Sequence, residues 1–142
     1  MAELQGRKVD KRHYADYASR AQQLLNAAER SFENAEWDAC AINSIQSAIS
    51  TSDALCTFRL AQRNANQRHE DAIKLFKSIG PQDEAIQENA RRLSRILGAK
   101  NASAYEEKPV SSREAEYLLV EARRLFDFVR SRLPQIRQVV EF

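Results

Sequence analysis

Apolar residues recur every three or four positions over most of the chain, which is the period of an α-helix. The first such segment spans residues 13–32 and contains Tyr14, Tyr17, Ala21, Leu24, Leu25, Ala28 and Phe32. The same period continues over residues 35–60, 69–78, 81–97 and 112–133. Because short connections make neighbouring helices antiparallel, the pattern predicts an all-α, up-and-down bundle of four to five helices.

The Gly80-Pro81 pair decides between four and five helices. Proline lacks a backbone N–H and disfavours helical backbone in the residue before it, so a chain reversal here predicts five. A reversal would bring the connections at residues 61–68 and 98–111 to the same end of the bundle, whereas a kink would leave them at opposite ends. Further along, Ser-x-x-Glu at Ser111–Glu114 is a capping box and predicts the start of the last helix.

Composition supports a single helical domain. A chain of 142 residues fits one domain, and 43% hydrophobic with 30% charged residues excludes a disordered or collagen-like chain. Only 3 Gly and 3 Pro occur, which is too few for the tight turns of a sheet-rich fold. We therefore expect a loose N-terminal segment at residues 1–12, the bundle at residues 13–133, and an apolar tail at residues 134–142 that docks on the body or on a partner.

The sequence favours the cytoplasm. No apolar run approaches 18 residues, so no membrane-spanning helix is expected. The polar start, residues 1–11, has no hydrophobic stretch typical of a secretion signal. Cys40 and Cys56 lie 16 residues apart on one predicted helix, about 24 Å at 1.5 Å per residue, so they cannot bond to each other. Two thiols of this kind are typical of buried fillers in a reducing compartment.

Charge is balanced overall but uneven along the chain. There are 22 Lys and Arg against 20 Asp and Glu, which is too even for general nucleic-acid binding. Two stretches contain no acid: residues 54–66, with Arg59, Arg63 and then Arg68 just beyond, and residues 89–105, with Arg91, Arg92, Arg95 and Lys100. They are interpreted either as solvated helix ends, where cations meet the negative end of the dipole, or as an anion-binding patch.

One pair of residues suits metal-independent RNA cleavage, namely Arg63 and His69 in the run RNANQRH. An imidazole can take the proton of a 2′-hydroxyl or protonate the leaving oxygen, and a guanidinium can hold the phosphate. The alternatives are a capping or packing histidine and a solvated loop arginine. No Walker loop, GxGxxG, HExxH or GxSxG occurs, and with two histidines the chain predicts neither a metal site nor a cofactor.

A second polar connection, GAKNASAYEEKPVS, carries Lys100 and Tyr105. The lysine can bind a phosphate and the tyrosine can stack on a base, or the tyrosine can simply pack over the end of the bundle. Together with Arg59, Arg68 and Arg95, these two residues form the predicted binding set.

The chain resembles the HEPN family of small helical nucleotide- and RNA-associated domains over residues 13–133. The resemblance is carried by four stretches: RAQQLLNAAERSFENAEWDACA, AINSIQSAISTSDAL with RNANQRH and EDAIKLF, GAKNASAYEEKPVS, and SREAEYLLVEARRLFDFV. It implies a homodimer acting in toxin–antitoxin pairs, defence or RNA processing, with a nucleotidyltransferase or antitoxin as protein partner. Catalytic members carry Arg-x(4–6)-His near the start of the last helix, where this chain has no histidine; the motif is assigned instead to Arg63–His69.

Three functions follow as expectations. The first is a cytoplasmic homodimer that binds RNA or a nucleotide without strong catalysis, through Arg63, Arg68, His69, Lys100 and Tyr105. The second is a ribonuclease toxin that uses Arg63 and His69 as catalytic residues. The third is a helical protein-interaction module, suggested by the apolar tail and by the small residues of the second helix.

Overall fold

The protein is a bundle of long helices with a small β-ribbon at one end. The computed structural model describes residues 6–64, 68–100 and 108–134, and these contain five α-helices. The elements are β1 (Gly6–Lys8), the 3-10 helix η1 (Lys11–His13), α1 (Tyr14–Glu33), α2 (Trp37–Leu60), β2 (Gln62–Asn64), α3 (His69–Lys77), α4 (Glu84–Lys100) and α6 (Ser112–Ser131). The all-α bundle predicted from the hydrophobic period is therefore confirmed.

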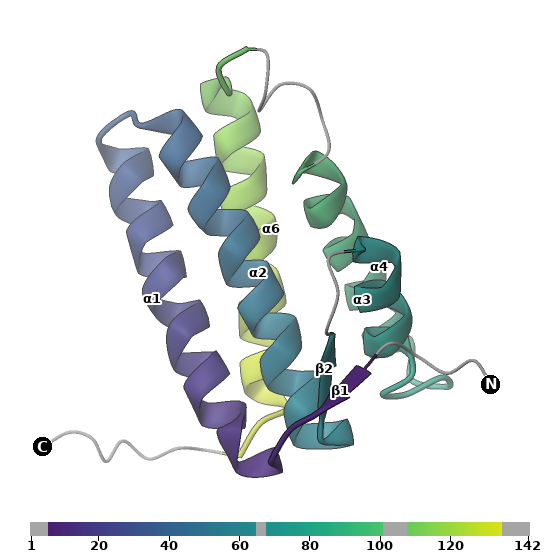
Figure 1. Ribbon diagram of the computed structural model, residues 1–142. Helices are drawn as coiled ribbons and strands as arrows, with labels where there is room; N and C mark the ends of the chain where they lie inside the picture. Colours follow the sequence, from purple (N-terminus) through teal and green to yellow (C-terminus); the bar gives the residue numbers. More distant parts are fainter. Residues whose placement is uncertain (1–5, 65–67, 101–107, 135–142) are drawn as a thin grey trace, which may run out of the picture.

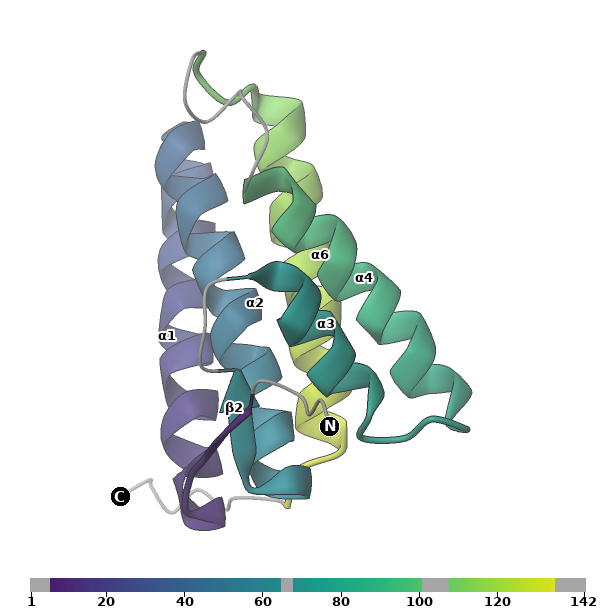
Figure 2. The ribbon, with the colours of Figure 1, turned by 45° about the vertical axis from the view of Figure 1, so that its right-hand side comes forward.

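The helices form two groups around α2. Helices α1, α2 and α6 lie side by side, and the hairpin of α3 and α4 packs on the other side of α2 and α6 (Figures 1 and 2). The β-ribbon lies against the C-terminal part of α2, at the lower end of both views. Helix α2 thus contacts every other helix of the described chain, so its sequence must suit burial on nearly all sides.

Small side chains allow α2 to take this central place. Ser44, Ser47 and Thr57 are fully buried, as are the neighbouring alanines. The Ser47 hydroxyl donates a hydrogen bond to the Ala21 carbonyl at 2.8 Å, which joins α2 to α1 without a bulky side chain between them. The Thr51 hydroxyl donates to the Ser47 carbonyl, also at 2.8 Å. The small-residue stripe of the second helix is therefore used inside the bundle.

The Gly80-Pro81 pair reverses the chain, as expected for a five-helix bundle. Helix α4 begins at Glu84, three residues after Pro81, because Asp83 caps it. The Asp83 carboxylate accepts hydrogen bonds from the N–H groups of Ala85 and Ile86 at 3.0 and 3.3 Å. The Gln87 side chain donates to the Gly80 carbonyl at 2.9 Å and closes the turn.

The start of α6 also agrees with the sequence. Ser111 accepts a hydrogen bond from the Glu114 N–H at 3.0 Å, and the Glu114 carboxylate accepts one from the Ser111 N–H at 2.8 Å. These two bonds hold the pKa of Glu114 below its ordinary value. Both ends of the predicted capping box are thus present, and α6 begins at Ser112.

Residues 6–12 are more ordered than the sequence suggested. Residues 1–12 were expected to be loose, but β1 pairs antiparallel with β2 in the register Gly6–Asn64, Arg7–Arg63 and Lys8–Gln62. Asp10 then caps η1 by accepting a hydrogen bond from the Arg12 N–H at 3.0 Å. The pairing joins residues more than fifty positions apart, so no local sequence pattern predicts it. The predicted tail beyond Pro134 lies outside the described residues.

Both cysteines are free and buried on α2. Burial raises the pKa of the Cys56 thiol to about 12, and it also raises the pKa of Cys40. The two thiols therefore act as apolar fillers of the core, as their spacing predicted.

Candidate functional site

Arg63 lies on β2 and points back toward the helices. Its guanidinium is 4.0 Å from the Asp53 carboxylate of α2 and 5.7 Å from the centre of the Tyr17 ring of α1. Only 29% of its side chain is exposed. Arg63 therefore ties the β-ribbon to α1 and α2, and most of its donors face the protein.

Asp53 is the acidic partner of this contact. It is buried in the last third of α2, and burial raises its pKa to about 6, although the charges of Arg63 and Arg20 act in the opposite direction. A carboxyl group with this pKa gains and loses a proton close to neutral pH. The sequence placed Asp53 among small helical residues but gave no sign that an arginine from a strand would face it.

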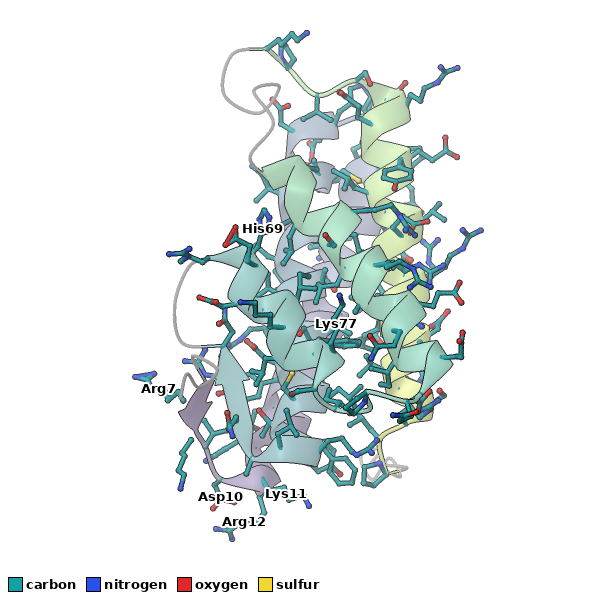
Figure 3. All side chains as sticks on the ribbon, turned by 90° about the vertical axis from the view of Figure 1, so that its right-hand side faces the viewer. Arg7, Asp10, Lys11, Arg12, His69 and Lys77 are labelled. Carbon is teal, nitrogen blue, oxygen red and sulfur yellow. The ribbon has the colours of Figure 1, made fainter. Side chains whose placement is uncertain are left out.

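Arg68 and His69 lie at the start of α3. Arg68 is the N-cap residue, and its exposed guanidinium is 3.5 Å from Glu70 and 4.0 Å from Asp71. His69 is the first residue of the helix and is partly exposed. Figure 3 shows His69 well above the lower end of the bundle, where Lys11 and Arg12 lie, and also above Arg7.

The chain reversal does not bring the two predicted loops together in the described part of the chain. Helix α3 has 9 residues and α4 has 17, so α4 runs about 12 Å beyond the start of α3 at 1.5 Å per residue. Figures 1 and 2 place β2, with Arg63, near the lower end and the last turn of α4 near the upper end. Lys100 closes α4, and Tyr105 lies outside the described residues.

Arg59 lies with Arg63 in a cluster of cations that we call the basic end, formed by residues 6–20 and 53–64. These residues include seven Lys and Arg but three Asp and no Glu. The basic end therefore has a larger net positive charge than the whole chain, whose formal charge is +2. Figure 3 shows Lys11 and Arg12 at the lower edge of the molecule and Arg7 directed outward at its left edge.

Most cations of the basic end have no carboxylate within ion-pair distance among the residues described. Arg12 pairs with Asp10 at 2.6 Å, and its hydrogen bonds hold the pKa of that carboxyl well below the usual range. Lys11 lies over the Phe58 ring at 5.2 Å. Arg7, Lys8 and Arg59 are exposed. These side chains can therefore contact an anion without first breaking an ion pair.

Arg95 belongs to a second basic cluster, distant from Arg63 along the fold. It lies on α4 with Arg92, and both donate to the Glu121 carboxylate of α6, at 3.3 and 3.0 Å. The stretch of residues 89–105 contains no acid in the sequence. In the fold, Glu121 of α6 lies against Arg92 and Arg95 of this stretch. The order of charges along the sequence could not reveal this contact.

Sequence reasoning missed Arg7, Lys8 and Lys11, because residues 1–12 were expected to have no fixed place. Their signal was the run GRKVDKRH, which has five basic or histidine positions and one acid. Among the described residues, no group of His, Cys, Asp and Glu side chains could hold a metal ion. Within the same residues, no helix is long and apolar enough to cross a membrane.

Comparison with known proteins identifies a family but no individual relative. A family model described as HEPN domain matches residues 14–132. No curated protein and no solved structure matches the chain significantly. The matched residues include all five helices of the described chain, so the family match and the bundle describe the same unit.

Proposed function

This chain belongs to the HEPN family, and on that premise we propose that it binds the phosphates of RNA or of a nucleotide through its basic end. HEPN domains are generally associated with ribonuclease or nucleotide-related roles and with dimerisation. The observation that carries the proposal is the local charge: seven Lys and Arg against three Asp in residues 6–20 and 53–64. Phosphate contacts of this kind supply most of the sequence-independent affinity for nucleic acid.

The β-ribbon supports this role by its register. Arg7 and Arg63 are paired across the two strands. Arg63 faces Asp53, whereas Arg7 is exposed and has no carboxylate at ion-pair distance among the described residues. Arg7 can therefore contact an anion directly.

Binding is tested by fluorescence anisotropy of a labelled single-stranded RNA over a range of salt concentrations. The Arg7→Ala/Lys11→Ala double variant is expected to bind about tenfold more weakly. It is also expected to lower the slope of log affinity against log salt by about 1.4, since each phosphate that is no longer neutralised lowers it by about 0.7. The control is Arg30→Ala/Lys108→Ala, which removes two exposed cations outside the basic end. Equal weakening in both variants, or none in the first, would refute the proposal.

The same assay separates binding from cleavage. Cleavage by Arg63 and His69 requires a guanidinium that is free to hold phosphate, whereas that of Arg63 faces Asp53 and Tyr17. We therefore expect the RNA to stay intact on denaturing gels. RNA cut by the wild type and left intact by His69→Ala would instead support the ribonuclease alternative.

The proposal includes a homodimer. Ile42 of α2 is one of two large hydrophobic side chains that are well exposed among the described residues, at 43%, and Ile49 lies two turns further along the helix. Light scattering is expected to give twice the chain mass for the wild type and a smaller mass for Ile42→Arg. A wild-type monomer would remove the dimer from the proposal.

A further inference from the structure

A cluster that we call the arginine seam lies where α4 packs on α6. Its centre is the Glu121 carboxylate, whose side chain is 8% exposed. One carboxylate oxygen accepts from Arg92 at 3.0 Å and from Arg95 at 3.3 Å, and the other accepts from Arg124 at 3.4 Å. Three guanidiniums thus share one carboxylate, which leaves two positive charges without compensation.

The three arginines are held to different degrees. Arg92 is 17% exposed and also donates to the Asn89 side-chain oxygen at 2.8 Å, so it is fixed within the protein. Arg95 and Arg124 are 49% and 61% exposed. Because a guanidinium has five N–H donors, each of these two retains donors that face solvent while Glu121 fixes its position.

No further acid among the described residues compensates the seam arginines. Five other carboxylates on the same two helices are exposed, and all lie beyond ion-pair distance of every seam arginine; they are Glu84, Glu88, Glu114, Glu116 and Asp127. A network that served only stability would gain little from two half-exposed cations, since such pairs contribute at most about 1 kcal/mol.

An aromatic ring lies at the edge of the seam. Tyr117 stands one turn before Glu121 on α6 and is 46% exposed, the other large hydrophobic side chain that the described surface presents. Its side chain lies near the Arg95 guanidinium and contributes to raising the pKa of that group. An exposed aromatic ring beside exposed arginines is the combination that holds a nucleobase by stacking while the phosphate is bound by charge.

We propose that the arginine seam binds a nucleoside phosphate, with Arg95 and Arg124 on the phosphate and Tyr117 on the base. Glu121 and Arg92 are positioning residues, because they hold the two exposed guanidiniums and face the protein interior. The ligand is either a free nucleotide or one unit of an RNA strand, which present the same phosphate and base. The seam is separate from the basic end, so this proposal stands or falls independently of the first.

The test titrates the full-length protein, labelled with ¹⁵N, with AMP, ATP and a short single-stranded RNA in separate experiments. The arginine Nε–Hε signals of Arg95 and Arg124 are expected to shift on addition of at least one of these probes. Arg95→Ala/Arg124→Ala is expected to weaken binding of that probe at least tenfold, because both guanidiniums that hold the phosphate are removed. Tyr117→Ala is expected to weaken it about fivefold or more because the base can no longer stack, whereas Tyr117→Phe keeps the ring and the affinity.

The controls separate this site from other exposed cations and from misfolding. Arg30→Ala/Lys108→Ala, which removes two exposed cations outside both surfaces, is expected to leave nucleotide binding at the seam unchanged within twofold. Arg95→Lys keeps the charge but not the planar fork and is expected to bind with intermediate affinity, and its thermal melt reports whether the fold is intact. Shifts with ATP or AMP identify a free nucleotide, and shifts with RNA alone identify a strand. No shift at Arg95 and Arg124 with any probe, or full binding by the double variant, would overturn the proposal.

Discussion

The basic end and the arginine seam both collect cations, but they hold them in different ways. At the basic end, seven Lys and Arg meet three Asp, and exposed side chains such as Arg7 and Lys8 have no carboxylate at ion-pair distance among the described residues. At the seam, three guanidiniums converge on Glu121. The first arrangement suits phosphates at variable positions, as along a flexible strand, whereas the second fixes a few donors in one geometry.

The two surfaces differ in how much side-chain conformational freedom they lose when a ligand binds. Long free side chains lose rotamer freedom on binding, whereas Arg95 is already held by Glu121 and loses less. Pre-organised donors therefore favour a small ligand that offers few contacts. Substitutions can distinguish the two surfaces. The largest change in the free energy of unfolding is expected at Glu121, the centre of the seam.

Glu121→Gln is expected to cost about 3 kcal/mol in the free energy of unfolding. Removing one partner of a buried ion pair leaves the other uncompensated, and here Arg92 is held inside while Arg95 and Arg124 can turn to solvent. Urea denaturation measures the change. Glu116→Gln, at an exposed position of the same helix, serves as control and is expected to change stability by less than about 0.5 kcal/mol. A cost below about 1 kcal/mol for Glu121→Gln would mean that the carboxylate does not organise the seam.

Asp53 makes the stability of the basic end depend on pH. Because burial raises its pKa to about 6 in the folded protein, against about 3.9 when unfolded, the folded state holds the proton more tightly. The contribution of Asp53 to stability is therefore greatest below pH 4, falls between pH 4 and pH 6, and is constant above. Relative to Asp53→Asn, the wild type is expected to lose about 2 kcal/mol between pH 4 and pH 7. Parallel pH profiles for the two proteins would show that Asp53 has an ordinary pKa.

Arg63→Ala is expected to raise the pKa of Asp53 further, by roughly 1 unit, since an opposite charge 4.0 Å away is removed. Carbon-13 NMR of the Asp53 carboxyl group follows this titration directly. Arg59→Ala is the matched control, because Arg59 is exposed and makes no ion pair with another described residue. An unchanged pKa in Arg63→Ala would assign the charge compensation to Arg20.

Arg124→Ala is expected to change the free energy of unfolding by less than about 0.5 kcal/mol, although it breaks an ion pair with the same Glu121. Its guanidinium is 61% exposed, and exposed pairs contribute little. Thermal melts compare it with Arg130→Ala, another exposed arginine of α6. A cost as large as that of Glu121→Gln would make the seam a purely structural network.

The helices were predictable because their signals are local. Apolar spacing, the Gly80-Pro81 reversal and the Ser111–Glu114 capping box each act within a few residues, and each predicted element lies within a few positions of the observed one. The end of α4 is less well predicted. The apolar period ends at residue 97, but the helix continues through Gly98 to Lys100, and nothing lies within 4 Å of the place where a side chain at Gly98 would be.

The candidate site was predictable only in part, because it depends on contacts between distant segments. Arg63 was predicted to hold a phosphate from a loop, but it lies on β2, which pairs with β1, and its guanidinium faces Asp53 and Tyr17. The convergence of Arg92 and Arg95 on Glu121 joins residues 29 and 26 positions apart on two helices. Relative helix length also escaped local reasoning: α4 extends past α3 and carries Lys100 away from Arg63.

The two buried cysteines of α2 have a practical consequence for these experiments. Thiol-reactive dyes attack the thiolate, which the elevated pKa values of Cys40 and Cys56 keep scarce in the folded protein. A cysteine introduced at an exposed position, such as Lys8 or Ser94, can therefore be labelled selectively in the native chain. Spectroscopic reporters can be attached beside either surface without first replacing the natural thiols.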